Sequence, residues 1–141
     1  MDIECCFNLT MRQSNRILTQ FYEERLAQVG VKSGQFALLR AINKLKQTTN
    51  KELQEILVID QTTLSRNLKP LIRDNLLVIS TDEQDQRRKL IRLSSAGEKL
   101  YLEVLPIWQN IQRELVDKLG SKDLQQIQSL ATRLTKKLTN S

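Results

Sequence analysis

The sequence contains no histidine, only four glycines and two prolines, and few aromatic residues. Without histidine, the commonest general base of enzymes is absent, and a nucleophilic serine or cysteine would lack its usual partner. The glycines form no phosphate-binding loop, and no pair of carboxylates has a spacing typical of acid–base catalysis. We therefore expect no catalytic residue, no cofactor and no enzymatic activity. The scarcity of glycine, proline and aromatic residues also argues against an all-β fold.

Long apolar runs and secretion signals are missing as well. No segment approaches the roughly 20 apolar residues that span a bilayer, and no cationic start followed by an apolar core marks a signal peptide. The two cysteines, Cys5 and Cys6, are adjacent and provide no disulfide framework, as is usual in a reducing compartment. We expect a cytoplasmic protein with no membrane partner.

Positive charge is what the sequence has in excess. Lysine and arginine number 22 against 16 acidic residues, which gives a formal net charge of +6 and an isoelectric point near 9.5. This balance favours a polyanionic partner, although a basic protein need not have one. The 141 residues suffice for one domain with its own core and an appended region for self-association.

The stretch from Asp60 to Leu93 organises the chain. Its first part predicts a helix over residues 61–74 with one buried face, because apolar residues recur every three or four positions: Leu64, Leu68, Leu71 and Ile72. The residues between them are short and polar or cationic, as suits a helix in the major groove of DNA. Two β-like runs, 76–80 and 89–93, follow and flank a polar segment, which predicts a hairpin. A helix followed by such a hairpin outlines a winged helix-turn-helix.

Two features run against the pattern of this helix. Pro70 lies inside it, where proline removes a hydrogen bond and costs about 3 kcal/mol, so we expect a bend rather than a break. The preceding turn, residues 58–60, lacks the glycine often found in helix-turn-helix units. Asp60 is expected to cap the helix and Asn75 to end it in the left-handed conformation.

Helical signals also precede this stretch. Thr49 and Glu52 form a capping box that opens a short helix to about residue 57. Ser33 is expected to cap a helix over about residues 34–46. An apolar stripe from about Ile3 to residue 29, ended by Gly30, predicts a long first helix.

Apolar stripes continue towards the C-terminus. Ser95 and Glu98 form a second capping box, and the helix that they open should reach nearly to Gly120, with a kink at Pro106. Ser121 is expected to cap a last helix, whose apolar stripe is Leu124, Ile127, Leu130, Leu134 and Leu138. Because a small core cannot cover such stripes at both ends of the chain, we expect the ends to pack together across a two-fold dimer. A monomer whose ends fold back on themselves is the alternative.

The order of these segments resembles the MarR family of bacterial transcriptional regulators over nearly the whole chain. The resemblance is carried by Gln35-Phe-Ala-Leu-Leu, Leu64-Ser-Arg-Asn-Leu, Asn75-Leu-Leu-Val and, above all, Asp82-Glu-Gln-Asp85-Gln-Arg87 running into Leu90-Ile-Arg-Leu-Ser-Ser-Ala-Gly97. Asn75 replaces the usual glycine and Ser94 the usual threonine. The resemblance implies a mainly α fold of the α+β class. A single domain would span residues 1–141, with the winged helix-turn-helix lobe at 33–93 and dimerisation helices at 1–30 and 95–141.

The resemblance also implies a homodimeric, sequence-specific DNA-binding regulator, most often a repressor, on a pseudo-palindromic operator in double-stranded DNA. Arg87 at the wing tip would enter the minor groove, with Asp85 holding its guanidinium. Arg66 is the best candidate to read guanine, and Asn67 could read adenine. The expected DNA-binding residues are Thr49, Gln61, Thr62, Thr63, Ser65, Arg66, Asn67, Lys69, Arg73, Asp85, Arg87, Arg88 and Lys89. For each charged residue the alternative is a solvated surface charge.

Cys5 and Cys6 suggest one way in which the regulator could be controlled. Some relatives sense oxidants through a cysteine near the start of the first helix, and Cys6-Phe-Asn-Leu resembles that segment of the organic-peroxide sensors. The two tyrosines that activate the sensing cysteine are replaced here by Gln20 and Ser33, and the acidic residues at positions 2 and 4 would oppose a thiolate. We favour buried cysteines that act as small apolar packers. Redox sensing and metal binding are the alternatives.

Release by a small ligand is the other control that the resemblance implies. The family's ligand pocket would here involve the first two helices and Trp108, and small aromatic compounds are common inducers of relatives. Trp108 is more often a core residue than a ligand contact. A helical interaction protein without DNA binding is a different class, in which the charged hairpin would have no purpose.

Overall fold

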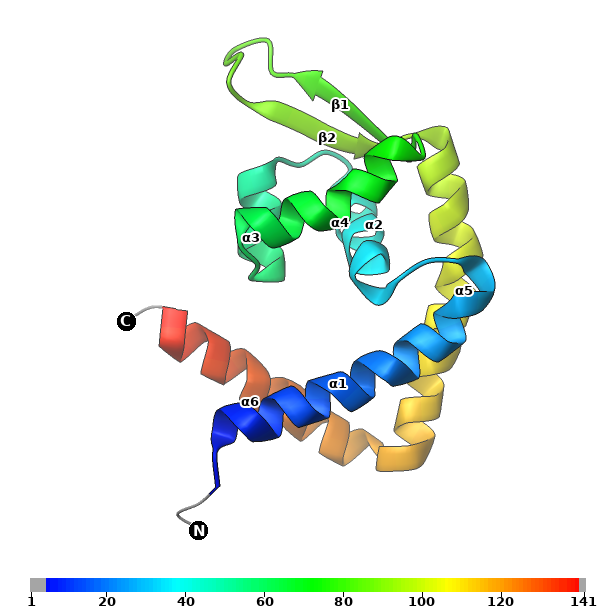
Figure 1. Cartoon of the computed structure of the whole chain (residues 1–141), viewed down its shortest axis with the longest axis vertical. Helices are drawn as coiled ribbons and strands as arrows, with labels where there is room; N and C mark the ends of the chain where they lie inside the picture. The colour runs from blue at the N-terminus through cyan, green and yellow to red at the C-terminus, as the bar shows by residue number, and fades with distance from the viewer. Residues whose placement is uncertain (1–4, 140–141) are drawn as a thin grey trace. The chain divides into compact units, whose positions relative to one another are not determined.

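The structure is a computed structural model that describes residues 5–139 (Figure 1). Ile3 and the acidic residues at positions 2 and 4 lie outside the described residues. The first helix does not start near Ile3 as predicted, because Cys5 and Cys6 are not helical and α1 begins at Phe7. The elements are α1 (Phe7–Leu26), the 3-10 helix η1 (Ala27–Val29), α2 (Ser33–Leu45), α3 (Asn50–Leu57), α4 (Gln61–Arg73), β1 (Leu77–Thr81), β2 (Lys89–Leu93), α5 (Ser95–Leu119) and α6 (Ser121–Thr139). This order confirms the mainly α fold with a small sheet. The chain divides into two compact units, up to Leu105 and from Pro106 onward.

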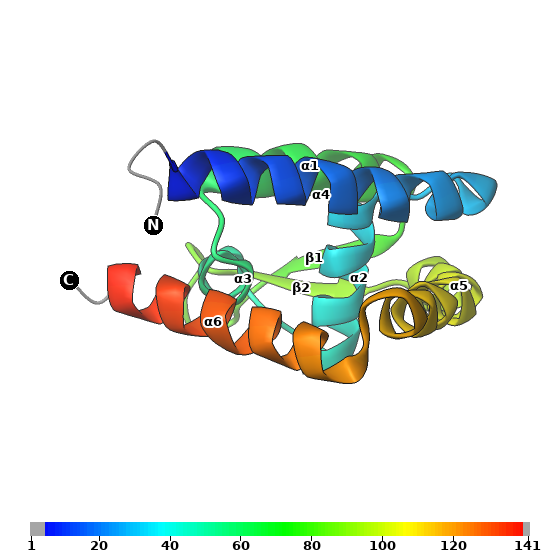
Figure 2. The ribbon, with the colours of Figure 1, turned by 90° about the horizontal axis from the view of Figure 1, so that it is seen from below.

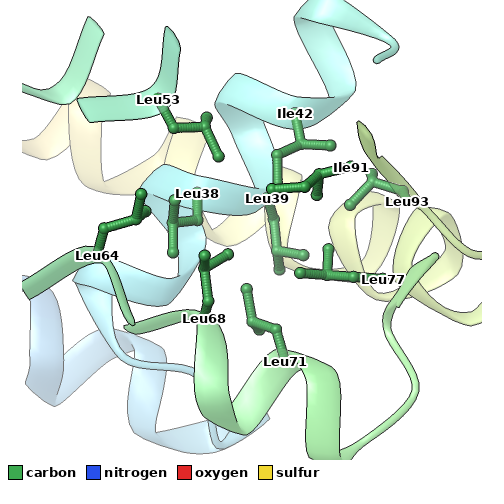
Figure 3. Close-up of a cluster of buried hydrophobic side chains, with 10 residues drawn as sticks. All are labelled: Leu38, Leu39, Ile42, Leu53, Leu64, Leu68, Leu71, Leu77, Ile91 and Leu93. Atoms are coloured by element: carbon green, nitrogen blue, oxygen red, sulfur yellow. The ribbon is translucent and has the colours of Figure 1, made fainter. Parts of the chain in front are cut away.

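One apolar cluster forms the core of the first unit (Figure 3). α4 contributes Leu64, Leu68 and Leu71, as predicted, and α2, α3 and both strands supply the other members, Leu38, Leu39, Ile42, Leu53, Leu77, Ile91 and Leu93. Burial stabilises the fold by on the order of 1.5–3 kcal/mol for each such side chain. The prediction that Ile72 faces inward is wrong, because its side chain is 45% exposed. It follows Leu71 by about 100° around the helix and so leaves the buried face.

The boundaries of α3 and α4 follow the predicted caps. Thr49 Oγ1 accepts a hydrogen bond from the N–H of Glu52 at 3.2 Å, and Asp60 Oδ1 accepts one from the N–H of Thr63 at 2.7 Å. Between the two helices, Val58 occupies the place of the missing glycine with a left-handed φ of 53°. A β-branched residue adopts this conformation only at a cost, so the tight turn stores local strain.

α4 passes through Pro70 without a break, as predicted. The helix is continuous over its 13 residues, and the N–H of Asp74 donates to the carbonyl of Pro70 at 3.0 Å. The last turn of the helix thus forms although Pro70 has no N–H of its own to donate.

Asn75 ends α4 in the predicted conformation, with φ 58°. Its N–H donates to the carbonyl of Ile72 at 3.1 Å, and the N–H of Leu76 donates to that of Leu71 at 2.9 Å. These two hydrogen bonds form a Schellman motif, which satisfies the last carbonyls of the helix and turns the chain into β1.

The hairpin consists of β1 and β2 in antiparallel register, from Leu77 opposite Leu93 to Thr81 opposite Lys89. Thr48, just before α3, adds an isolated bridge to β2: its N–H donates to Ile91 at 2.9 Å and its carbonyl accepts from Ile91 at 2.8 Å. Figure 2 shows β2 passing beside α2, with which it is in contact. The bridge was not predicted, because a single paired residue leaves no alternating pattern in the sequence.

The start of α5 is hydrogen-bonded to the end of α4. Ser94, and not the predicted Ser95, caps α5: its Oγ accepts from the N–H of Gly97 at 3.0 Å and donates to the carbonyl of Asn75 at 2.7 Å. The N–H of Ser94 also donates to the carbonyl of Leu76 at 3.0 Å. The helix starts one residue earlier than the capping box indicated, because Ser94 is the serine that can reach α4.

Two other predicted caps are wrong, since Ser33 and Ser121 are the first residues of α2 and α6. The N–H of Ser33 donates instead to Glu23 Oε1 of α1 at 2.8 Å. Gly120 precedes α6 with a left-handed φ of 83°, and Gly30 follows η1 with φ 67°, as predicted for the end of the first helix.

The second unit comprises α5 from Pro106 and the whole of α6. The apolar stripe predicted for α6 lies largely on its surface, since four of its side chains are 48% to 69% exposed: Ile127, Leu130, Leu134 and Leu138. Among the described residues, no helix is long and apolar enough to cross a membrane.

Substituting Gly97 by alanine should destabilise the protein. A Cβ there would lie 2.1 Å from the carbonyl oxygen of Leu76, so the junction between α4 and α5 would have to open. We expect the free energy of unfolding, measured by urea titration, to fall by about 1–3 kcal/mol, as for other overpacked sites. Gly34→Ala is the matched control, because its Cβ would meet only the Asn67 side chain, at 3.4 Å. Equal stability of the two variants would contradict the packing seen at the junction.

Candidate nucleic-acid interface

Two grooves, each lined by residues of the hairpin and of α3 or α4, join these elements into one surface. The first, of about 640 Å³, lies between α3 and the hairpin and is lined by Lys51, Arg87, Arg88 and Lys89, among others. The second, of about 540 Å³, lies between α4 and the hairpin. Its lining combines polar and cationic side chains with apolar ones: Asn50, Thr62, Ser65, Arg66, Lys69 and Lys89 with Leu68, Ile72, Ile79 and Ile91.

The outer face of α4 carries the expected polar residues. Gln61, Thr62, Ser65, Arg66 and Lys69 are exposed. They alternate with the buried leucines of the core at helical spacing, so the packing of one face fixes the direction of the other. Neither Arg66 nor Lys69 has a carboxylate within ion-pair distance among the described residues.

Thr63 and Asn67 lie on the flank of α4 away from the grooves, and both are half-buried. Asn67 packs against α2, where its Nδ2 would be 3.4 Å from a Cβ placed on Gly34. Neither residue lines a groove between α3, α4 and the hairpin. Asn67 therefore does not lie on the outer face of α4 with Arg66 and Lys69, although the sequence placed it among the DNA-binding residues.

The N-terminus of α4 is held by Asp60. The N–H of Thr63, with a smaller contribution from its hydroxyl and from the charge of Arg66, keeps the pKa of the Asp60 carboxyl below its ordinary value. The capping group is therefore an anion near neutral pH, as a helix N-terminus favours.

Three polar side chains form a hydrogen-bonded chain across α3 and α4. Gln54 Nε2 donates to Gln61 Oε1 at 2.6 Å, and Gln61 Nε2 donates to Ser65 Oγ at 2.9 Å. The role of Gln54 was not predicted, because nothing in the linear pattern shows that it lies beside Gln61, seven residues further on.

The hairpin tip is folded by its own acidic residues. Asp85 Oδ1 accepts from the backbone N–H of Arg87 at 3.0 Å, and Asp82 Oδ1 accepts from that of Gln84, also at 3.0 Å. The resemblance placed Asp85 on the guanidinium of Arg87, whereas here the carboxylate binds the main chain. Among the described residues Arg87 forms no ion pair, and Arg88 lies 3.9 Å from Asp82.

The remaining expected residues have protein partners. Thr49 is buried and its hydroxyl caps α3. Arg73 pairs with Asp74 through a 3.1 Å contact, which raises the pKa of the guanidinium. Lys89 Nζ donates to Thr81 Oγ1 on the opposite strand at 3.1 Å.

Cys5 and Cys6 are exposed and not disulfide-bonded. Cys6 immediately precedes α1, and its carbonyl accepts the first hydrogen bond of that helix, from Thr10 at 3.0 Å. The interpretation of these residues as buried apolar packers is therefore wrong.

Comparisons with known proteins agree with this geometry. A family model described as a winged helix DNA-binding domain matches residues 31–97. The chain is 27% identical to the uncharacterized HTH-type transcriptional regulator YwoH of Bacillus subtilis, over 80% of this chain and 82% of that one. Its structure is similar to that of the Mycobacterium tuberculosis transcriptional regulator MosR in complex with DNA, with 28% identity, a TM-score of 0.80 and coverage of 94% and 98%. It also shares the fold of a MarR mutant from Escherichia coli complexed with operator DNA, with a TM-score of 0.80 at 20% identity and coverage of 90% and 91%.

A recognition helix, a preceding helix joined by a tight turn and a charged hairpin define a winged-helix DNA-binding protein, and its relatives are transcriptional regulators rather than enzymes. The chain is a winged-helix DNA-binding regulator whose fold is similar to that of MarR from Escherichia coli. The winged helix-turn-helix that the sequence predicted is thereby confirmed.

Proposed function

We propose that this regulator binds a pseudo-palindromic operator as a homodimer, with α4 of each subunit in the major groove and the hairpin at the adjacent minor groove. The observation that carries the proposal is the exposed face of α4. There Arg66 and Lys69 stand without ion pairs, next to a hairpin whose Arg87 is equally unpaired among the described residues. A protein that binds such operators would work in the cytoplasm. The cytoplasmic location stays a prediction.

The distribution of charge supports this assignment. Between Gln61 and Arg92, seven cations (Arg66, Lys69, Arg73, Arg87, Arg88, Lys89, Arg92) outnumber four anions (Asp74, Asp82, Glu83, Asp85), a net +3 against +6 for the whole chain. Half of the excess thus lies in less than a quarter of the sequence. Such a concentration attracts the phosphates, which supply much of the affinity for DNA.

Within this proposal the residues have different tasks. Arg66 is placed to donate to guanine, while Thr62, Ser65 and Lys69 meet base edges or the neighbouring phosphates. Arg87 enters the minor groove, whose negative potential is strongest where A·T pairs narrow it. Arg88 and Lys89 meet phosphates. Thr49, Asp60 and Asp85 act indirectly, by holding α3, α4 and the hairpin tip in shape.

Arg87→Ala should weaken operator binding and reduce its dependence on salt. The homodimer loses one phosphate-neutralising cation in each subunit, so the slope of log K against log salt should fall by about 2. Fluorescence anisotropy titrations at several salt concentrations measure both quantities. Lys118→Ala, which makes the same change in charge at an exposed position of α5, should leave them unchanged. If the Arg87 and Lys118 variants bind alike, the hairpin does not contact DNA.

The homodimer rests on the apolar surfaces that the two units leave uncovered. In α6, Ile127, Leu130 and Leu134 are 48% to 56% exposed and lie on one stripe. In the first unit, the N-terminal part of α1 exposes Phe7 by 68% and Met11 by 47%. A second copy of the chain would bury such stripes, and a two-fold axis would present two copies of α4 to half-sites about 10 base pairs apart.

Leu134→Glu should therefore convert the protein to a monomer and abolish tight operator binding. A charge placed in an apolar interface cannot be solvated there, so dimerisation should weaken by at least about tenfold. Thr132→Glu adds the same charge on the opposite face of α6 and is the control. Sedimentation equilibrium at micromolar concentration distinguishes the two. A Leu134→Glu variant that stays dimeric would rule out this stripe as the interface.

The regulator is proposed to act as a repressor that is released by a signal. Release by a small aromatic effector stays a prediction from the resemblance. Thiol oxidation gains support from the exposure of Cys5 and Cys6, because an oxidant in solution can reach both sulfur atoms. A cysteine sulfur would attack the O–O bond of an organic peroxide, forming a sulfenic acid and releasing the alcohol.

Treatment with cumene hydroperoxide should release the protein from its operator if the cysteines sense oxidants. The double variant Cys5→Ser/Cys6→Ser should stay bound under the same treatment, because it has no thiol to oxidise. Mass spectrometry would show one added oxygen or a disulfide in the wild-type protein. Equal release of both proteins, or oxidised protein that still binds, would exclude this signal.

A further inference from the structure

The hydrogen-bonded chain of Gln54, Gln61 and Ser65 restrains the Gln61 amide. Gln54, on α3, is half-buried, whereas Gln61 and Ser65 are exposed on α4. Gln54 Nε2 donates to Gln61 Oε1 at 2.6 Å, and Gln61 Nε2 donates to Ser65 Oγ at 2.9 Å. If the Gln61 amide alone turned over, its NH₂ group would face the NH₂ group of Gln54, so donor would meet donor. If both amides turned over together, with Ser65 then donating, Gln61 would again use one lone pair and one N–H.

An inventory of donors and acceptors shows what Gln61 can still offer. A glutamine amide has two lone pairs on its oxygen and two hydrogens on its nitrogen. The chain uses one of each, which leaves one lone pair on Oε1 and one N–H on Nε2. This is the pair that adenine requires in the major groove, where its N6 donates and its N7 accepts.

We propose that Gln61 reads an adenine in each half-site and that Gln54 is a positioning residue that orients it. The inference deepens the proposed function and rests on α4 lying in the major groove. Gln61 is the first residue of α4, and recognition helices of helix-turn-helix proteins contact base edges mainly with their N-terminal residues. Asn67, the adenine reader favoured by the sequence, packs against α2 instead.

The positioning role follows from what an unrestrained glutamine would do. A free amide can turn to offer donors to guanine or the mixed pair to adenine, so it discriminates weakly between these bases. When the amide is held by two hydrogen bonds, it cannot turn to offer two donors to guanine. It also lowers the conformational entropy that Gln61 loses when DNA binds.

The experiment begins with selection of bound sequences from random DNA by the wild-type protein and by Gln61→Ala. We expect the wild type to enrich a pseudo-palindrome with an adenine at one position of each half-site. Gln61→Ala should enrich the same palindrome and lose the preference at that position by about fivefold or more, as for loss of a bidentate contact. If no sequence is enriched, the proposed function itself fails. If Gln61→Ala keeps the preference, only the assignment of Gln61 fails.

Substitutions of Gln54 then test the positioning role, with the ratio of affinities for adenine and guanine at that position as the readout. Gln54→Lys keeps a donor for Gln61 Oε1 and should keep the ratio. Gln54→Leu removes the restraint, and Gln54→Glu offers only acceptors and would turn the amide over, so both should lower the ratio towards that of Gln61→Ala. A uniform effect of the added charges on affinity cancels in the ratio.

Gln47→Leu, the same chemical change at an exposed position before Thr48, is the control and should match the wild type. Thermal unfolding of each variant accompanies the titrations, so that loss of fold is distinguished from loss of preference. An unchanged ratio in both Gln54→Leu and Gln54→Glu, or a lowered one in Gln54→Lys, would overturn the positioning role.

Discussion

The packing of the α4 leucines onto α2 is the interaction on which the recognition surface depends. Leu64, Leu68 and Leu71 enter a core shared with α2, α3 and both strands, so a single apolar cluster holds the recognition helix and the hairpin. Because a helix has only one rotation that buries these three side chains, their burial also sets which polar residues face outward. The polar residues of α4 are therefore oriented by the packing of its apolar face alone.

Hydrogen bonds outside the core then fix the position of the hairpin and the first turn of α4. The bridge between Thr48 and Ile91 ties the hairpin to the start of α3, and Asp60 fixes the first turn of α4. The strained φ of Val58 shortens the connection between the two helices. Together these links hold α3 in contact with α4, and Gln54 in the second turn of α3 is hydrogen-bonded to Gln61 in the first turn of α4.

Much of this architecture could be predicted from the sequence, since the apolar periods, the Thr49 and Asp60 caps and the Asn75 stop are local signals. The errors arose where a distant residue decided the outcome. Ser33 is the first residue of α2 rather than its cap, and its N–H donates to Glu23 of α1. Ser94 rather than Ser95 caps α5 because it can reach Asn75. The class of the site was readable in the same way, from its charge and its motifs. The separation of Asn67 from Gln61, and the bond between Gln54 and Gln61, required the three-dimensional arrangement.

The junction at Ser94 has a consequence for the way a signal could travel. One hydroxyl group is hydrogen-bonded both to the last turn of α4, through the carbonyl of Asn75, and to the first turn of α5, through the N–H of Gly97. Because residue 97 is glycine, the backbone of α5 lies against the backbone of Leu76 with no side chain between them. One backbone therefore cannot shift without moving the other. The end of α4 and the start of α5 are therefore rigidly connected. A tilt at the beginning of α5 would move the recognition helix α4 without unfolding the winged helix-turn-helix.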